Sequence, residues 1–171
     1  MLLKRKVSAL AVAAAAAAGL FVSASGTASA GTAVAQAAGS SDHTTGGVVL
    51  HYPAAPEGAR ATATLVTAVS PTISPAVRTE HGAPGASYTC ASGNLCLVVW
   101  DPTTSDYKRF SLYTCQKYAL SNWNGWGNYY DAQTGGVTSY FYDSSGHVLK
   151  SFTSGHNVDQ DWTPVWSVRN C

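Results

Sequence analysis

The sequence predicts a small all-β domain over residues 88–171, and three observations lead to this prediction. The apolar runs in this region are short, rich in valine, tyrosine, phenylalanine and tryptophan, and bounded by turn-forming residues. No stretch of the region has a convincing helical period. All four cysteines and all five tryptophans of the 171-residue chain lie within it. A domain of this size has a small core, and disulfide bonds commonly stabilise such a core.

A pattern of aromatic, acidic and basic residues occurs twice in this region, as W-D-P-T-T-S-D-Y-K-R-F at 100–110 and Y-D-S-S-G-H-V-L-K-S-F at 142–152. Four positions match at a constant spacing of 42 residues, namely Trp100/Tyr142, Asp101/Asp143, Lys108/Lys150 and Phe110/Phe152. We interpret the two copies as a duplicated β unit that cannot bury its apolar face alone but can do so against its twin. Chance similarity within a simple β sequence is the alternative.

The amino-terminal end is typical of a secretory signal peptide covering residues 1–30. A basic segment, M-L-L-K-R-K, precedes an alanine-rich apolar run at 7–22, and Ala28-Ser29-Ala30 provides small residues for cleavage. A second A-Q-A at 35–37 leaves open whether cleavage follows Ala30 or Ala37. We therefore expect a secreted, extracellular protein without a membrane anchor.

Residues 31–87 are dominated by alanine, threonine, glycine, serine, proline and valine, with Tyr52 as their one aromatic residue. Such a composition buries too little apolar surface to offset the entropy cost of ordering the chain. The sequence therefore predicts a disordered linker. A propeptide that covers the domain until it is removed is the alternative.

Export places the four cysteines in an oxidising compartment, so we expect two disulfide bonds. Three pairings are possible. We favour Cys90–Cys96, which closes a short loop around Ser92-Gly93-Asn94, together with Cys115–Cys171, which ties the carboxyl-terminal residue to the middle of the domain.

The C-A-S-G-N-L-C opening, the strand L-V-V-W-D after it and the duplicated aromatic motif give the region 88–171 a family resemblance. It resembles the small secreted βγ-crystallin-like proteins of actinomycetes, nearest the peptidase inhibitors of the Streptomyces metalloproteinase inhibitor type. The resemblance implies two Greek-key motifs that form one β-sandwich. It is also similar in architecture to crystallin-like killer-toxin and antifungal proteins.

The sequence departs from the calcium-binding version of that family. Thr138-Ser139 match its hydroxyl pair, but Thr134-Gly135 stand where two acidic or amide side chains are needed. Calcium requires several oxygen ligands, most of them from such positions. We therefore expect no metal site of the family type and no cofactor.

The sequence predicts no enzyme, because none of the common catalytic or nucleotide-binding motifs occurs in it. The domain has two histidines, His147 and His156, both in turn-like segments, and it contains no glutamate. Asp101 and Asp143 stand at hairpin starts, where turn capping explains them more simply than acid–base chemistry. The formal net charge of +1 gives no reason to expect a nucleic acid or an anionic membrane as partner.

The segment S-N-W-N-G-W-G-N-Y-Y, residues 121–130, has four aromatic residues but little strand pattern. One interpretation is a lid that folds its rings onto the core. The other is an exposed recognition surface, since tryptophan and tyrosine give large contact areas at low entropy cost. That candidate surface consists of Trp123, Asn124, Trp126, Tyr129 and Tyr130.

These observations lead us to expect a monomeric secreted binding protein, and a peptidase inhibitor before other kinds. Its partner would be a secreted protease, held by a rigid surface that two disulfides lock in place. The alternatives are an antimicrobial protein of killer-toxin type, a cell-wall-glycan-binding protein, and a structural envelope protein of crystallin type.

Overall fold

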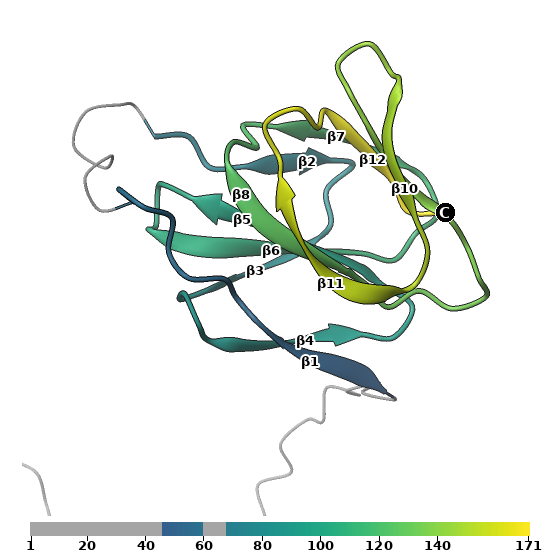
Figure 1. The fold of residues 1–171 in the computed structure, drawn as a ribbon, viewed down its shortest axis with the longest axis horizontal. Helices are drawn as coiled ribbons and strands as arrows, with labels where there is room; N and C mark the ends of the chain where they lie inside the picture. Colours follow the sequence, from purple (N-terminus) through teal and green to yellow (C-terminus); the bar gives the residue numbers. More distant parts are fainter. Residues whose placement is uncertain (1–45, 60–67) are drawn as a thin grey trace, which may run out of the picture. The chain divides into compact units, whose positions relative to one another are not determined.

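The fold is taken from a computed structural model that describes residues 46–59 and 68–171 (Figure 1). The expected signal peptide, both expected cleavage positions and part of the expected linker lie outside these residues. Within them twelve strands and no helix are formed, so the all-β prediction is confirmed. No described helix is therefore long and apolar enough to cross a membrane.

The strands follow one another along the described chain. They are β1 (Gly47–His51), β2 (Thr72–Ser74), β3 (Arg78–Gly82), β4 (Ser87–Ala91), β5 (Leu95–Asp101), β6 (Asp106–Leu112), β7 (Lys117–Ser121), β8 (Trp126–Asp131), β9 (Ser139–Tyr142), β10 (Val148–Phe152), β11 (Gly155–Asp161) and β12 (Ser167–Arg169).

The strands form two five-stranded sheets and one two-stranded ribbon. Sheet I has the order β10-β9-β12-β7-β2, and sheet II has the order β11-β8-β5-β6-β3. The ribbon consists of β1 and β4, paired antiparallel from Gly47 opposite Ala91 to His51 opposite Ser87. Figure 1 shows the ribbon below sheet II, at the opposite side of that sheet from β2 and β7.

The groups β5–β8 and β9–β12 are arranged in the same way. In the first group β5 lies between β6 and β8 in sheet II, while β7 crosses to sheet I. In the second group β9 lies between β10 and β12 in sheet I, while β11 crosses to sheet II. Each sheet therefore takes three strands from one group and one strand from the other, and β2 or β3 completes its edge.

The main core fills the space between the two sheets. Alternate residues of β5 and their cross-strand partners point into it, for example Leu97, opposite Phe110 on one side and Tyr129 on the other. Phe141 and Trp162 meet these rings from the other half of the domain, with ring centroids 5.2 Å apart. Edge-to-face and tilted contacts of this kind add to the area that aromatic residues bury.

A second apolar cluster covers the outer face of sheet II. Val98 and Tyr107 point out of the sheet and are covered by Leu50, Tyr52 and Tyr88 of the ribbon and its neighbouring residues. The ring centroids of Tyr52 and Tyr88 are 4.6 Å apart. Because both faces are covered, β5 is a continuous apolar run and does not alternate between apolar and polar residues.

The structure corrects the interpretation of residues 31–87 as a disordered linker and of residue 88 as the domain boundary. Strands β1, β2 and β3 all come from that segment and belong to the same compact unit as the remaining strands. Strands β2 and β3 are edge strands held by backbone pairing to β7 and β6, which needs few apolar side chains. The part of the segment at 31–45 and 60–67 lies outside the described residues.

Both favoured disulfides are present. Cys90–Cys96 joins β4 to β5, with a Cα–Cα distance of 5.9 Å. Cys115–Cys171 joins the connection between β6 and β7 to the residues after β12, with a Cα–Cα distance of 5.4 Å. Both separations lie in the ordinary range for disulfides.

Candidate functional site

The structure divides the expected recognition surface of residues 121–130 between core and surface. Trp123 is only 4% exposed, and its indole N–H donates to the carbonyl oxygen of Thr72 at 2.7 Å. Tyr129 is 2% exposed and packs against Phe141. These two residues cannot contact a partner, and for them the lid interpretation holds.

The other members of that surface lie nearer to solvent. Trp126 is 61% exposed, Asn124 is exposed, and Tyr130 is half-buried. The division follows from the alternation of β8, in which Trp126, Asn128 and Tyr130 point to the outer face of sheet II. The sequence pattern of β8 is hard to recognise because its inward position 127 is a glycine. There a side chain would collide with the carbonyl oxygen of Val98.

Trp126 lines a groove of about 580 Å³ on the outer side of sheet II. The groove is bounded by Pro53, Pro56, Tyr107 and two carboxylates, Glu57 and Asp159. The Tyr107 hydroxyl donates to the carbonyl oxygen of Ala54 at 2.8 Å, which fixes the segment of prolines against the sheet. An exposed indole between two acceptors is suited to stacking on a sugar ring whose hydroxyls donate hydrogen bonds.

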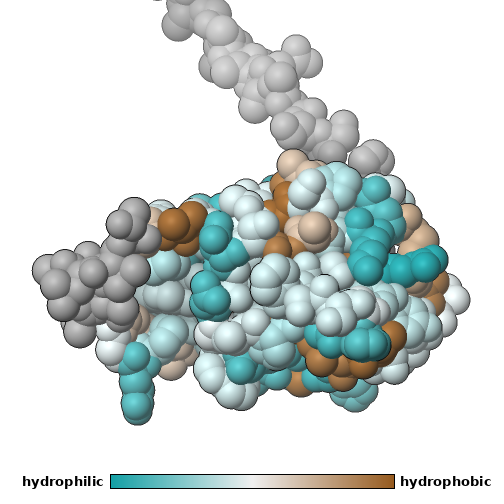
Figure 2. All heavy atoms as spheres, turned by 90° about the horizontal axis from the view of Figure 1, so that it is seen from above, coloured by the Kyte–Doolittle hydropathy of each residue, from teal (hydrophilic) through white to brown (hydrophobic). Residues whose placement is uncertain are grey.

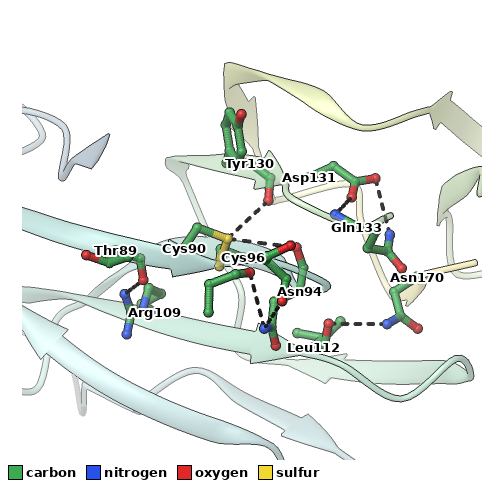
Figure 3. The surroundings of a disulfide bond; sticks show 12 residues. Thr89, Cys90, Asn94, Cys96, Arg109, Leu112, Tyr130, Asp131, Gln133 and Asn170 are labelled. Carbon is green, nitrogen blue, oxygen red and sulfur yellow. Dashed lines mark hydrogen bonds between the residues drawn. A yellow bond between two sulfur atoms is a disulfide. The ribbon is translucent and has the colours of Figure 1, made fainter. Parts of the chain in front are cut away.

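Both disulfides clamp the end of the sandwich at which β5 begins. The loop closed by Cys90–Cys96 exchanges backbone hydrogen bonds with the connection after β8, from Gly93 N–H to Ala132 C=O and from Ala132 N–H to Asn94 C=O. The Asn94 amide also donates to the carbonyl oxygen of Ala91 at 3.3 Å. Figure 3 shows this disulfide, with Asn94 beside it and Asp131 close by.

The connection between β8 and β9 is held at its base by a buried polar network. The carboxylate of Asp131 accepts from the backbone N–H of Gln133 at 2.9 Å and from the hydroxyl of Ser139 at 3.2 Å. The Gln133 amide bridges to the same hydroxyl at 2.7 Å. Residues 134–136 beyond this network are exposed. The result is an exposed loop on a rigid base.

The second disulfide is anchored to the same end through Asn170. Its side-chain oxygen accepts from the backbone N–H of Gln116 at 3.1 Å, and its amide donates to Leu112 C=O at 3.3 Å. Between these anchors stands Tyr113, which is 74% exposed. A side chain at position 93 would lie 3.1 Å from its ring, so Tyr113 adjoins the Cys90–Cys96 loop. We call the loops at 91–94, 113–114 and 132–138 the disulfide end.

The residues that the sequence analysis compared with a calcium site are those at 134–135 and 138–139. Ser139 uses its hydroxyl within the Asp131 network, and Thr134 is exposed. In the described residues no three histidine, cysteine, aspartate or glutamate side chains are grouped so that they could hold a metal ion. His147 lies in the β9–β10 hairpin, 3.2 Å from the carboxylate of Asp143.

A polar cluster around Asp101 was not foreseen. Asp101 is fully buried, and its carboxylate accepts from the hydroxyl of Ser70 at 2.5 Å and lies 3.1 Å from His81 Nε2. Although burial raises the pKa of Asp101, the hydrogen bonds from Ser70, Thr103 and His81 lower it to about 2. The cluster was not predictable from the sequence, because Ser70 and His81 lie in the segment interpreted as a linker.

The contacts of this cluster join parts of the chain that lie far apart in the sequence. The ammonium of Lys108 donates to the Ser70 hydroxyl at 3.0 Å, and that hydroxyl donates onward to the carboxylate of Asp101. Lys108 also donates to Pro71 C=O, so the cluster fastens the chain before β2 to the end of β5.

Comparisons with protein-family models, with curated proteins and with solved structures gave no match to this chain.

The described surface offers small hydrophobic areas (Figure 2). The face seen there is mostly hydrophilic, with its hydrophobic side chains in separate patches. Among the described residues the exposed large apolar side chains include Tyr113, Trp126 and Trp166, which come from three different connections or strands. Single exposed aromatic residues on a rigid support are suited to contact with a partner.

Proposed function

We propose that the chain is a secreted binding protein of the peptidase inhibitor kind, built as two crystallin-like Greek-key motifs. The strand order supports the fold proposal, because β5–β8 and β9–β12 each send their third strand into the opposite sheet. The two copies of the sequence pattern lie at equivalent places, on β5–β6 and on β9–β10. Disulfides are compatible with an extracellular protein.

The observation that carries the inhibitor proposal is the rigidity of the disulfide end. An inhibitor must present an exposed segment that is too rigid to take up the conformation needed for cleavage. A segment that is already ordered also loses less entropy when it binds. Two disulfides, the backbone hydrogen bonds to Ala132 and the Asp131 network hold the three loops of this end. Tyr113 supplies an exposed aromatic anchor at their centre.

The test is titration of the oxidised chain from residue 31 onward against secreted metallo-, serine and cysteine proteases. We expect stoichiometric inhibition of at least one class, with the inhibitor intact by mass spectrometry after the reaction. Residual protease activity is the readout. No inhibition at concentrations well above micromolar would remove the proposal for the classes tested.

A matched pair of variants locates the contact. Tyr113→Ala removes the exposed ring at the disulfide end, and Trp126→Ala removes an exposed ring from the outer face of sheet II. We expect Tyr113→Ala to raise the inhibition constant about tenfold or more, as truncation of an interface anchor does. The Trp126→Ala variant should inhibit as the parent does. Equal effects of both substitutions would contradict the proposed contact surface.

The groove at Trp126 favours a second candidate function, binding of a cell-wall glycan. Its exposed indole, with Glu57 and Asp159 at the sides, is suited to a sugar ring. Pull-down with insoluble peptidoglycan and chitin tests this function. We expect the parent protein and the Tyr113→Ala variant to bind to the insoluble glycan, and the Trp126→Ala variant to stay in solution. Retention of Trp126→Ala would exclude the groove as the glycan site.

A further inference from the structure

A second, larger groove lies between the ribbon and the edge of sheet II. It measures about 1020 Å³ and has a polar lining. Strand β4 forms one wall, with Ser87, Thr89 and Ala91, and the floor contains Arg78, Glu80 and Arg109. Figure 1 shows β4 below β3 and β6, and neither strand pairs with it.

The groove exposes an unused backbone edge of β4. Tyr52 N–H donates to Ala86 C=O, and Ser92 N–H donates to Gly46 C=O. The backbone N–H and C=O groups of the even-numbered residues of β4 therefore point toward β1. In an antiparallel strand the backbone groups of alternate residues point to opposite edges. The backbone groups of Ser87, Thr89 and Ala91 therefore point toward the groove, and all three residues belong to its lining.

Arg109 supports this assignment. Its Nη1 donates to the carbonyl oxygen of Thr89 at 2.6 Å, which places that carbonyl on the groove side of β4 (Figure 3). Ala91 C=O is occupied by Asn94. Among the described residues, no hydrogen-bond partner is found for Thr89 N–H or for the two backbone groups of Ser87, and these groups form the edge that an added strand can use.

The floor of the groove carries an excess of positive charge. Arg109 is 5% exposed and forms an ion pair with Glu80. The same carboxylate pairs with Arg78 at 2.6 Å, so two guanidinium groups share one carboxylate. The guanidinium side chain of Arg78 is 77% exposed and is accessible to a second anion. His81 also lines the groove, with its Nε2 directed to Asp101.

Two hydrogen-bond donors in the groove lining lack acceptors. The Tyr88 hydroxyl and Arg109 Nε are buried and have no partner among the described residues. Tyr88 is 6% exposed and its ring lies 5.2 Å from the guanidinium carbon of Arg109, so the two groups are neighbours. Burial and the nearby Tyr52 raise the pKa of Tyr88 above its usual range, which keeps its hydroxyl protonated and able to donate. Unmatched buried donors are costly and favour an acceptor that supplies lone pairs to both.

We propose that this groove binds an extended peptide segment carrying an aspartate or glutamate side chain, which pairs with β4 as an added strand. Backbone hydrogen bonds to Ser87 and Thr89 hold the segment, and its carboxylate pairs with the exposed guanidinium group of Arg78. Addition of a strand to an open edge supplies affinity through the backbone, while side-chain pockets select the sequence. The groove adjoins the proposed inhibitor contact, because its lining includes Tyr113 and Thr114. The two kinds of binding differ in the residues that hold the partner, which are Ser87 and Thr89 of β4 for the added strand and Tyr113 for the protease.

The experiment uses ¹⁵N-labelled oxidised chain from residue 31 onward and three blocked pentapeptides of alternating threonine and valine. Their central residue is glutamate, glutamine or lysine. We expect saturable amide shifts at Ser87 and Thr89 with the glutamate peptide, affinity at least about tenfold weaker for the glutamine peptide, and none measurable for lysine. Equal affinity for all three peptides would overturn the acidic selectivity. The absence of shifts in β4 at millimolar peptide would overturn the site.

Two variants with matched controls separate edge pairing from charge. Thr89→Pro removes the N–H that faces the groove without removing a bond to β1, and Thr89→Val retains that N–H. We expect at least about tenfold weaker binding for Thr89→Pro and parent-like binding for Thr89→Val. Arg78→Glu removes the ion pair with Glu80 but leaves the ribbon unchanged, so it keeps the test valid if proline disturbs the ribbon.

The Arg78→Glu variant should bind the glutamate peptide about tenfold more weakly and should also bind the lysine peptide. The Arg78→Lys variant should bind both peptides as the parent does. Unchanged binding of the glutamate peptide to both Thr89→Pro and Arg78→Glu would overturn the proposal. Free glutamate tests whether a carboxylate alone, without a peptide backbone, is enough for binding. If it bound as tightly as the peptide, the backbone part of the proposal would be wrong.

Discussion

Asp101 is a buried carboxylate that hydrogen bonds from several parts of the chain stabilise. Its carboxylate accepts from Ser70, from the hydroxyl of Thr103 at 2.6 Å and from the backbone N–H of Thr103 at 2.9 Å. His81 approaches the same carboxylate from β3. These contacts tie three separate parts of the chain to the end of β5. Protonation of Asp101 would weaken them together.

We predict an acid-labile component of stability from Asp101. Its pKa falls from 3.8 to about 2, so the folded state binds its proton more weakly than the unfolded state does. The resulting stabilisation, on the order of 2 kcal/mol, is complete above the unfolded value near 3.8 and is lost as pH falls toward 2. Urea unfolding followed by tryptophan fluorescence between pH 7 and pH 2 measures it.

Asp101→Asn should remove this component and flatten the stability curve in that pH range. Asp143→Asn is the matched control, because Asp143 makes a similar turn contact to Ser145 N–H at 2.8 Å but stands in an exposed hairpin. Its effect should be clearly smaller. A parent-like decline in stability from pH 4 to pH 2 in Asp101→Asn would contradict the assignment to Asp101.

Gly127 shows how one small residue shapes the inner face of β8. A Cβ atom at this position would lie 1.9 Å from the carbonyl oxygen of Val98 and 2.8 Å from the indole nitrogen of Trp162. That nitrogen donates to the same carbonyl at 2.8 Å. The absence of a side chain therefore allows Trp162 to close the core over β5.

We predict that Gly127→Ala destabilises the domain by about 3 kcal/mol or more, because backbone and a buried hydrogen bond must both move. Thermal unfolding gives the measurement. Gly146→Ala is the control for loss of glycine in general, since a Cβ there meets nothing within 4 Å, although its φ of 83° adds local strain. A larger loss of stability in the control would contradict the steric explanation.

The ribbon and the two edge strands are the elements that sequence reasoning missed. Composition alone assigned residues 31–87 to a linker, yet Leu50 and Tyr52 are 8% and 5% exposed against sheet II. The signal is weak because a few apolar side chains are enough to fix a two-stranded ribbon once backbone pairing is available. The surface that the ribbon covers, the outer face of β5, could not be identified from the local sequence.

We predict that residues 88–171 alone are much less stable than the chain from residue 31 onward. The shorter chain loses the partner of β4 and exposes the apolar surface that Leu50 and Tyr52 cover, at about 1.5–3 kcal/mol for each side chain. Urea unfolding of both chains tests this difference. Tyr52→Ala in the longer chain should reproduce part of it, about 3 kcal/mol. Equal stability of the two chains would show that the ribbon contributes nothing.

The candidate recognition surface was partly predictable for a related reason. Four aromatic residues in ten identified an unusual segment, but burial of Trp123 depends on Thr72 and Trp162, which lie far from it in sequence. Tyr113 was not singled out, because one exposed tyrosine has no pattern of its own. The disulfide pairing was predictable, since a short loop and a long closure were the simplest arrangement of four cysteines.

At the scale of the whole molecule, the two disulfides differ in what they constrain. The closure by Cys115–Cys171 spans a sequence separation of 56 residues, against 6 for Cys90–Cys96. In the loop-entropy description the longer closure stabilises by about 4 kcal/mol and the shorter by about 2 kcal/mol. The long disulfide therefore accounts for a large part of a typical domain stability of roughly 5–15 kcal/mol.

We predict that Cys115→Ser/Cys171→Ser lowers the free energy of unfolding more than Cys90→Ser/Cys96→Ser. Urea unfolding of the two double variants, compared at equal pH, measures the difference. The reduced parent should resemble a chain with both pairs removed. A larger loss in the Cys90→Ser/Cys96→Ser variant would indicate that the contacts of the short loop with Ala132 outweigh loop entropy.

The exchange of β7 and β11 between the sheets has a consequence for how the chain reaches its final form. Neither sheet can be completed until residues from both halves of the domain have been synthesised and brought together. Structure dominated by such distant pairings forms slowly compared with local structure. A ribosome-bound first half would hold β5, β6 and β8 without the strand that borders β8. Two copies that fold close together could then supply that strand to one another and form an interlocked pair.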